Sequence, residues 1–442
     1  MEQLAAQKKA WTPVQKFFFR FFCCLFLIYI FPFPIDSIPF VAEIGKINEK
    51  LTAWYTAIFE AYANLWHKII PWAGQHVYHL KTPITIFTNG SGDTTYDYTL
   101  LLTEFLLVLI ATILWTILDR RRRSFHSAYY WLRVLVRYYL ATMMFGYGFA
   151  KVFHLQMPFP YLSQLVQPFG DKSPMGLAWS FVGYSKAYSA YTGWGEVIGG
   201  LLLLFRRTTT LGSIVTSVVM LNVAILNYCY DIPVKLFSSV LLLMAAFLVA
   251  PDARRLWSVF ILNRPTYSNY IGLKLTKRWT RITRPWVKWI FILYVLYSNI
   301  SSSIDGQKQY GDNRKKPPLY GIYNAETFVR NKDTIAPLTT DTTRWKQLVI
   351  QFEKFAQVKL MNDTLRRYNF IVDTVSKSVS VYPNTDTLSK SKLFYHSDTT
   401  YLVLSGKIKN DSVYMRFKKY DINKFRLVTR GFNWVNEFPF NR

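Results

Sequence analysis

Long apolar segments alternate with short polar connections over the first 304 residues of the chain. Seven segments are each long enough to cross a bilayer, and they cover residues 17–33, 98–118, 129–153, 188–205, 211–228, 234–250 and 286–304. A hydrocarbon core of about 30 Å requires about 17–25 helical residues. The pattern therefore predicts an all-α polytopic membrane bundle with about seven transmembrane helices.

The first apolar segment has the charged beginning of a signal peptide, in the form of Lys8, Lys9, Lys16 and Arg20. It ends in the run Phe31-Pro32-Phe33-Pro34, where no small residues mark a cleavage site. We therefore expect residues 1–33 to form an uncleaved signal-anchor helix whose N-terminus lies in the cytoplasm.

Basic residues gather in alternate connections between the apolar segments. They occur at Arg120–Arg123, at Arg206 and Arg207, at Arg254 and Arg255, and along residues 274–288. Such positive connections stay on the cytoplasmic side of a membrane. We therefore predict a multi-pass protein of the bacterial inner (cytoplasmic) membrane, with residues 34–96 and the part after residue 304 on the periplasmic side.

Residues 34–96 carry aromatic side chains within a more polar background, including Trp54, Tyr62 and Trp66. The aromatic side chains of an amphipathic helix settle at the boundary between membrane and water. We expect this external amphipathic region to lie along the membrane interface, ahead of a helical bundle that occupies residues 97–304.

The composition changes near residue 305, where Asp, Thr, Lys, Ser and Asn become frequent. Apolar and polar residues alternate there in short runs, for example over residues 347–352, 368–373, 401–405 and 413–417. Turn-forming residues separate these runs, which is typical of antiparallel strands. We therefore predict a small extracytoplasmic β-rich domain over residues 305–442, built as a meander barrel or a sandwich.

The formal charge of +27 on 442 residues raises the question of nucleic-acid binding. Much of this charge lies in the short connections, where it sets the topology, and no basic recognition helix or stacking module accompanies it. We therefore expect the lipid bilayer, and no nucleic acid, as a partner. The three cysteines, Cys23, Cys24 and Cys229, lack the spacing of a disulfide framework or a metal site, and we assign no metal.

Several ionisable and amide side chains lie within or beside the predicted spans, where a charge is costly and marks a candidate functional site. The candidates for ligand binding are Glu104, Arg137, Asn222, Asn227, Asp231 and Lys235. Lys151 and Glu196 are the candidates for catalysis, because Glu196 lies deepest and is surrounded by glycines that permit close helix approach. The alternative is structural, with ion pairs between helices and a helix cap over residues 231–235.

Three stretches of this region resemble the DoxX-like family. Residues 146–151 read Gly-Tyr-Gly-Phe-Ala-Lys, residues 195–207 contain Gly-Glu-Val-Ile-Gly-Gly and end in two arginines, and residues 222–231 complete the pattern. The resemblance implies a four-helix membrane core over about residues 129–250, and it singles out Lys151 and Glu196. The chain looks like a DoxX-like protein with an added C-terminal β domain.

The resemblance also implies a quinone- or redox-linked role, because the family takes its name from a membrane subunit of a thiosulfate:quinone oxidoreductase. We expect a polar pocket that opens to the outer leaflet, in which Glu196 accepts a proton and Lys151 holds an anionic or carbonyl group. A quinone is the candidate cofactor and a redox protein a candidate partner, although the residues leave open whether the protein is an enzyme. The alternative is a non-enzymatic membrane scaffold whose periplasmic β domain binds a protein partner or an envelope component.

Overall fold

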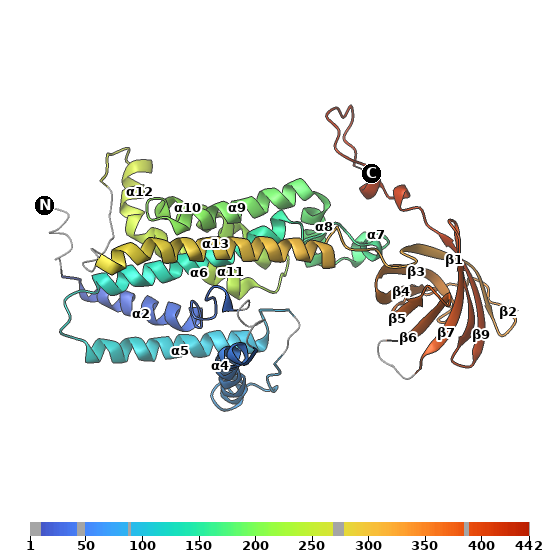
Figure 1. The fold of residues 1–442 in the computed structure, drawn as a ribbon, viewed down its shortest axis with the longest axis horizontal. Coiled ribbons are helices and arrows are strands. Elements are labelled where there is room, and N and C mark those ends of the chain that lie inside the picture. The colour runs from blue at the N-terminus through green and yellow to red at the C-terminus, as the bar shows by residue number, and fades with distance from the viewer. Residues whose placement is uncertain (1–9, 42–48, 87–89, 268–277, 384–388, 442) are drawn as a thin grey trace. The chain divides into compact units, whose positions relative to one another are not determined.

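The computed structural model describes residues 10–41, 49–86, 90–267, 278–383 and 389–441, so Lys8, Lys9, Lys274 and Lys277 lie outside the described residues. The chain divides into two compact units. The helical unit comprises Met1–Gln156 and Ala187–Asp305, and the barrel unit comprises Met157–Lys186 and Gly306–Arg442 (Figure 1). Residues 157–186, which connect two of the apolar segments, therefore belong with the barrel.

All seven apolar segments form helices (Figure 1). Their bounds are α2 Pro13–Ile30, α5 Thr95–Leu118, α6 His126–Val152, α9 Lys186–Leu204, α10 Thr209–Cys229, α11 Lys235–Val249 and α13 Arg278–Gln309. The aromatic stretch of the region before α5 forms a further helix, α4 Glu49–His76, and a short helix, α12 Ala253–Phe260, follows α11. The hydrophobic pattern thus predicted the position of each long apolar helix.

Side-chain caps fix where two of these helices begin. The hydroxyl of Thr12 accepts a hydrogen bond from the backbone N–H of Gln15 at 3.2 Å, and the Gln15 side chain accepts one from the backbone of Thr12 at 3.0 Å. Thr94 and Asp97 make the same reciprocal arrangement at the start of α5. Each capping box satisfies amide groups that the first helical turn leaves without partners.

Five helices in the described part of the chain are long and apolar enough to cross a membrane, which differs from the predicted seven. By length and composition these are Pro13–Ile30, Thr95–Leu118, Thr209–Cys229, Lys235–Phe260 and Arg278–Gln309. The two predicted spans that are not among them, α6 and α9, are rich in polar groups. α6 buries Arg133, Arg137 and Lys151, and α9 buries Glu196.

The helical unit has an apolar interior and an apolar exterior. Its interior is packed with side chains that are almost completely buried, among them Phe26, Val136, Leu140, Leu203 and Met244. Helix α5 in contrast exposes a row of large apolar residues, namely Leu102, Phe105, Leu106, Ile110, Ile113, Leu114 and Ile117. An exposed apolar surface of this size matches a helix that faces lipid.

Basic residues from separate connections meet at one end of this unit. A guanidinium nitrogen of Arg20 donates to the carbonyl oxygen of Asp119 at 2.7 Å, which joins the start of α2 to the end of α5. Arg284 donates to the hydroxyl of Tyr130 at 2.7 Å, and Arg206 lies 5.6 Å from the centre of the same ring. Two of the positive connections, those that carry Arg206 and Arg284, are therefore neighbours in space.

The barrel unit contains an antiparallel meander of nine strands within its described residues (Figure 1). They are β1 Gly321–Arg330, β2 Asp333–Thr334, β3 Trp345–Phe352, β4 Lys354–Leu360, β5 Leu365–Asp373, β6 Ser378–Pro383, β7 Ser391–Ser397, β8 Tyr401–Ile408 and β9 Asp411–Lys419. Each long strand pairs with the next, and β1 also pairs with β9 in a register that places Phe328 opposite Met415. This last pairing closes the sheet, so of the two predicted alternatives the barrel is the one that forms.

Side chains fill the barrel. Leu348, Val358, Leu402, Met415 and Phe417 are completely buried inside it. Alternation of apolar and polar residues along each strand sends one set inward and leaves the other set to water. The interior is thus a packed core.

The connection between α6 and α9 packs on this barrel through α7, Leu162–Leu165, and is followed by η1 Phe169–Asp171 and α8 Pro174–Tyr184. Leu162 is buried against Ile322 and Val349 of two adjacent strands. The backbone N–H of Ser163 donates to the side-chain oxygen of Gln351 at 3.0 Å. Apolar burial and hydrogen bonds to β3 therefore fix this connection as part of the barrel unit.

Candidate functional site

Lys151 and Glu196, the two residues predicted for catalysis, form an ion pair between α6 and α9. Nζ of Lys151 donates to Oε1 of Glu196, and the two side chains are only 8% and 2% exposed. Helical side chains tilt toward the N-terminus of their helix, so Lys151 reaches back from the end of α6 into the bundle. The other carboxylate oxygen of Glu196, Oε2, is buried without a hydrogen-bond partner among the described residues. The pair therefore keeps an acceptor for a proton, a water molecule or a ligand.

Glycines bring α6 and α9 close together beside this pair. A Cβ atom on Gly193 would lie 2.5 Å from the carbonyl oxygen of Gly148, and one on Gly148 would lie 2.7 Å from Cγ2 of Val197. Such distances leave no room for a side chain. The hydroxyl of Ser189 also donates to the carbonyl oxygen of Lys151 at 2.9 Å. The expected close helix approach is thus observed, and it sets the distance across which the ion pair forms.

Arg137, predicted as a ligand-binding residue, is buried farther from the end of α6. Its side chain is anchored to the last turn of α9, where Nε donates to the carbonyl oxygen of Leu203 at 2.9 Å. Carbonyl groups in the last helical turn lack partners within the helix. This contact gives Arg137 a structural role at the end of α9.

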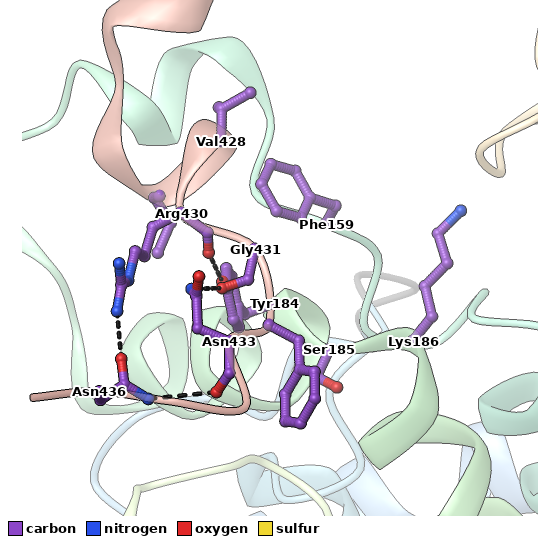
Figure 2. A pocket seen from close by; sticks show the side chains of 11 residues that line it. Phe159, Tyr184, Ser185, Lys186, Val428, Arg430, Gly431, Asn433 and Asn436 are labelled. Atoms are coloured by element: carbon purple, nitrogen blue, oxygen red, sulfur yellow. Dashed lines mark hydrogen bonds between the residues drawn. The ribbon is translucent and has the colours of Figure 1, made fainter.

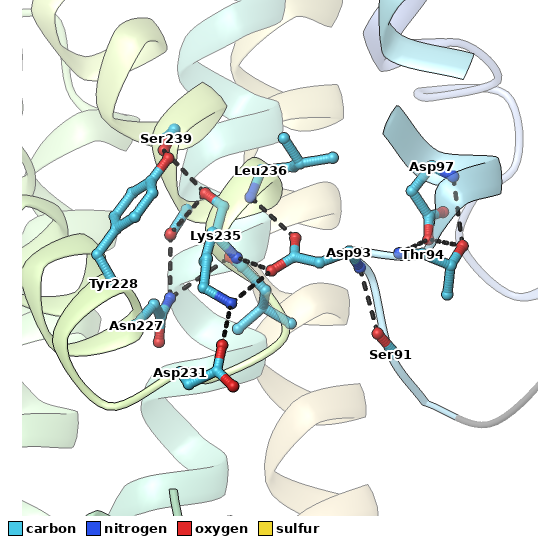
Figure 3. Close-up of polar contacts among 12 residues, drawn as sticks. Ser91, Asp93, Thr94, Asp97, Asn227, Tyr228, Asp231, Lys235, Leu236 and Ser239 are labelled. Atoms are coloured by element: carbon cyan, nitrogen blue, oxygen red, sulfur yellow. Dashed lines mark hydrogen bonds and ion pairs between the residues drawn. The ribbon is translucent and has the colours of Figure 1, made fainter. Parts of the chain in front are cut away.

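Asp93 connects the turn before α5 to the start of α11 (Figure 3). Its carboxylate accepts hydrogen bonds from the backbone N–H groups of Lys235 at 2.8 Å and Leu236 at 3.1 Å, the first two residues of α11. An acidic side chain at this position satisfies free amides and interacts favourably with the helix dipole. The residue that caps α11 is therefore Asp93, which is not among the candidates predicted from the sequence.

Asp231 and Lys235, both predicted for ligand binding, lie at this same turn. Nζ of Lys235 is 2.8 Å from Oδ1 of Asp231 and 3.7 Å from Oδ2 of Asp93 (Figure 3). The Asp231 side chain is 83% exposed and contacts the Lys235 side chain, not the helix amides. The structural alternative of a helix cap by Asp231 is therefore replaced by an ion pair beside a cap that Asp93 provides.

The other predicted residues lie on separate helices. The Nδ2 group of Asn227 donates to the hydroxyl of Ser238 at 3.0 Å and so joins α10 to α11. Asn222 is exposed on α10, and Glu104 is buried on α5. In the described part of the chain none of these three hydrogen-bonds to the ion pair between α6 and α9. Of the predicted polar residues, two thus form the ion pair and two lie at the turn before α11, and Arg137, Asn227, Asn222 and Glu104 lie elsewhere on the helices.

The ion pair carries groups that suit a quinone. The Lys151 ammonium has three N–H donors, of which the contact with Glu196 uses one, and a quinone carbonyl oxygen is an acceptor. Oε2 of Glu196 supplies an acceptor for a hydroxyl proton. No group of three His, Cys, Asp or Glu side chains in the described residues is placed to hold a metal ion.

A second candidate site is an open cleft of about 690 Å³ in the barrel unit. Its lining includes Phe159, Tyr184, Lys186, Arg430, Asn433 and Asn436 (Figure 2). The walls come from the connection before α9 and from the segment that follows β9. Aromatic faces, amide groups and two cationic side chains are thus combined there.

The helices that carry this ion pair are similar to known proteins. Residues 132–228, which include Lys151 and Glu196, match the DoxX family. Over 133 residues the chain is 35% identical to the uncharacterized protein YwoB of Bacillus subtilis (strain 168), a match that covers 28% of this chain and 79% of YwoB. No solved structure matches the chain. The matched helices contain the paired lysine and glutamate, and the chain has several long apolar helices. With these two matches, the chain is shown to be a multi-pass membrane protein of the DoxX family.

Proposed function

We propose that α6 and α9 also cross the membrane, which gives seven spans with the N-terminus in the cytoplasm and the barrel in the periplasm. The two helices have 27 and 19 residues, and at about 1.5 Å per residue both are long enough for a hydrocarbon core. Pairing of Lys151 with Glu196 lowers the cost of placing these charges in lipid. The basic connections, which meet at one end of the helical unit, support the orientation.

We further propose that the ion pair between α6 and α9 is the centre of a quinone- or redox-linked function. One observation carries this proposal: a carboxylate oxygen of Glu196 is buried without a partner beside a buried ammonium group. Unpaired buried acceptors are rare, because the lost hydration costs free energy. A binding partner or a transferable proton at Oε2 explains why such an arrangement persists.

Lys151 and Glu196 have different roles in this proposal. A bound quinone supplies the electron-accepting chemistry. Lys151 donates a hydrogen bond to a carbonyl oxygen and stabilises the negative charge that develops there. Glu196 accepts or returns a proton at Oε2, a role for which a carboxyl group in a low-dielectric setting is suited. We expect the ligand to enter from the outer leaflet, since Lys151 lies near the end of α6 that is remote from the basic connections.

Quinone binding by the purified protein tests this proposal. We expect menadione and its reduced form menadiol to bind the protein in lipid nanodiscs, and Glu196→Gln to weaken the binding of menadiol by about tenfold or more, since the hydrogen bond from a menadiol hydroxyl to the charged carboxylate is lost. Asp252→Asn is the matched control, because Asp252 is a buried carboxylate that accepts from the hydroxyl of Thr210 at 2.6 Å. Absence of binding to the native protein, or equal losses in both variants, would contradict the proposal.

A non-enzymatic scaffold is the second candidate function, and the cleft of the barrel unit favours it. Arg430 and Asn433 line this cleft beside three aromatic side chains, a combination suited to a periplasmic partner or an envelope component. The test removes residues 306–442 and replaces residues 157–186 by a flexible linker, because Leu162 would otherwise lose its apolar cover. If every phenotype of the native protein survives this change, the scaffold function fails.

A further inference from the structure

The chain leaves the barrel after β9 and ends in a segment that exposes large apolar side chains. It passes through η3 Ile422–Lys424 and α14 Arg426–Thr429 before residues 430–441, which we name the C-terminal aromatic segment. Phe432, Trp434 and Phe438 of this segment are 79%, 91% and 83% exposed. Single exposed apolar residues are common on proteins, but several in one short segment mark an interaction surface.

Hydrogen bonds hold the C-terminal aromatic segment in a defined shape (Figure 2). The hydroxyl of Tyr184 donates to the carbonyl oxygen of Arg430 at 3.2 Å, and the Arg430 guanidinium donates to the side chain of Asn436. The side-chain nitrogen of Asn433 donates to the carbonyl oxygen of Gly431 at 2.9 Å, and that of Asn436 donates to the carbonyl oxygen of Asn433 at 3.1 Å. The side chains of Arg430, Asn433 and Asn436 thus hold the shape of the segment, while Phe432, Trp434 and Phe438 remain largely exposed.

This segment is held against the part of the barrel unit where the chain continues into long apolar helices. Tyr184 lies two residues before Lys186, the first residue of α9. Nζ of Lys186 is 2.7 Å from Oδ2 of Asp312, which follows the last residue of α13 by three positions. The apolar segment of α13 ends at residue 304, and Asp312 follows it by five helical and three further residues. These extend over at most about 18 Å, so this region lies within about 18 Å of the level at which α13 leaves the membrane.

The residue types of the segment match the boundary of a bilayer. Tryptophan concentrates at the headgroup level, where its ring can leave water while its N–H keeps a polar partner. Phenylalanine adds an apolar ring, which an interfacial segment buries at the boundary of the acyl chains. Three cations, Lys424, Arg426 and Arg430, accompany the rings and favour anionic headgroups. Arg430 lies 4.5 Å from the centre of the Phe440 ring, so cationic and aromatic groups occupy one surface.

We propose that the C-terminal aromatic segment inserts its side chains into the outer-leaflet interface of the bilayer and so attaches the barrel to the membrane surface. This inference rests on the membrane topology proposed above. The occupant is the lipid itself, since the segment is joined within the barrel unit to the residues that lead into α9 and α13. A protein partner or a second copy of the chain is the outcome that would oppose it.

Photo-crosslinking in nanodiscs that contain phosphatidylglycerol tests the proposal on the full-length protein. Benzoylphenylalanine replaces Trp434 or Phe438 in the segment, and in separate variants Leu338 or Ile110. Leu338 is the matched control, because it is a 62% exposed apolar residue in the connection from β2 to β3, at the end of the barrel opposite to the one where β9 ends. Ile110, 54% exposed in the middle of α5, is the positive control for contact with lipid.

We expect lipid adducts at Trp434 and Phe438 to exceed those at Leu338 by on the order of tenfold, as for residues in the aromatic belt of a membrane protein. Equal yields at Trp434 and Leu338, with strong reaction at Ile110, would overturn the inference and leave the membrane topology intact. Loss of lipid adducts at Ile110 as well would overturn the topology and the inference together. Capture of a second polypeptide at Trp434 in place of lipid would assign the segment to a protein partner.

Discussion

Two ionic clusters of the helical unit use the same residue types in different ways. At the turn before α11, the carboxylate of Asp93 accepts two backbone hydrogen bonds and lies near the Lys235 ammonium. Between α6 and α9, the carboxylate of Glu196 has one partner, Lys151, and an oxygen that is buried without another. The first cluster is fully explained by helix capping. The second keeps an unsatisfied group that stability does not require, which is why it is the better candidate for function.

The largest effect is expected when one member of the buried ion pair is removed. Glu196→Leu leaves the Lys151 ammonium buried without a counter-charge, and we expect a loss of about 3–5 kcal/mol in the free energy of unfolding. The double variant Lys151→Met with Glu196→Leu should recover most of this loss, because no uncompensated charge remains. Thermal unfolding in detergent measures both. If the double variant is as unstable as the single one, the loss does not come from an unpaired Lys151 charge, and the prediction is contradicted.

The double variant also separates stability from function. If the ion pair only holds α6 to α9, the double variant should behave as the native protein in every assay. If the pair is the quinone-binding centre, the double variant should be stable and bind no menadione. Recovery of both stability and binding would place Glu196 with Asp93 among the structural residues.

A smaller effect is expected from a methyl group between α6 and α9. Gly193→Ala introduces a Cβ atom 2.5 Å from a backbone oxygen of α6, and we expect overpacking to cost about 1–3 kcal/mol. Gly195→Ala on the same helix is the control, because its Cβ atom would meet Val219 at an ordinary 3.5 Å. The comparison is made by thermal unfolding. Equal stability of the two variants would contradict the close approach of these helices.

Removal of the cap on α11 should cost less and leave binding intact. Asp93→Ala frees two backbone amides, and we expect a loss of about 0.5–2 kcal/mol without any change in menadione affinity. Asp231→Ala serves as control, since this exposed carboxylate takes part only in an ion pair near the surface, worth about 0–1 kcal/mol. A weaker menadione affinity in the Asp93 variant would mean that the two clusters act together.

The smallest effect is expected for the partly exposed ion pair of Arg330 with Asp411 in the barrel. This pair provides a reference for the buried pair of Lys151 with Glu196. Hydrogen bonds from Asn331 and Arg330 hold the pKa of Asp411 below its usual range. Their contribution to stability is therefore present above the pKa of an unfolded aspartate, about 3.9, and is lost as the pH falls through the lowered value. Asp411→Asn should flatten the acid unfolding curve of the barrel, followed by near-ultraviolet circular dichroism.

The control for this last prediction is Asp333→Asn, which alters an exposed aspartate of β2. It should leave the acid unfolding curve unchanged. A curve that is equally steep in the native protein and in the Asp411 variant would show that the exposed pair adds nothing measurable to folding.

Local pattern was sufficient to predict the long helices and four of the strands. Each apolar helix is a run of side chains that cannot remain in water, and alternation in residues 347–352 or 413–417 is the period of a strand. α6 and α9 were predicted as spans, but their composition is less apolar than that of the five candidate spans. Both helices contain charged side chains that are buried inside the helical unit. Lys151 and Glu196 were selected one by one from their cost in lipid. That they meet could not be predicted from residues, because 45 positions separate them.

Contacts between distant parts of the chain account for what the sequence did not reveal. Asp93 lies 142 positions from the amide that it caps. The sequence indicated only that this acidic residue and the start of α11 lie on the same predicted side of the membrane. The pairing of β1 with β9 that closes the barrel is equally remote in sequence. Leu162 gave no sign that it would pack on strands more than 150 residues later. Such contacts depend on complementary surfaces that exist only once both partners have folded.

The chain passes between its helical and barrel units three times, after Gln156, Lys186 and Asp305. A barrel attached by one linker is a module that evolution can add, exchange or lose at little cost. Here its loss would also require a new connection between the helices that carry the lysine and the glutamate. Change in either unit therefore constrains the other.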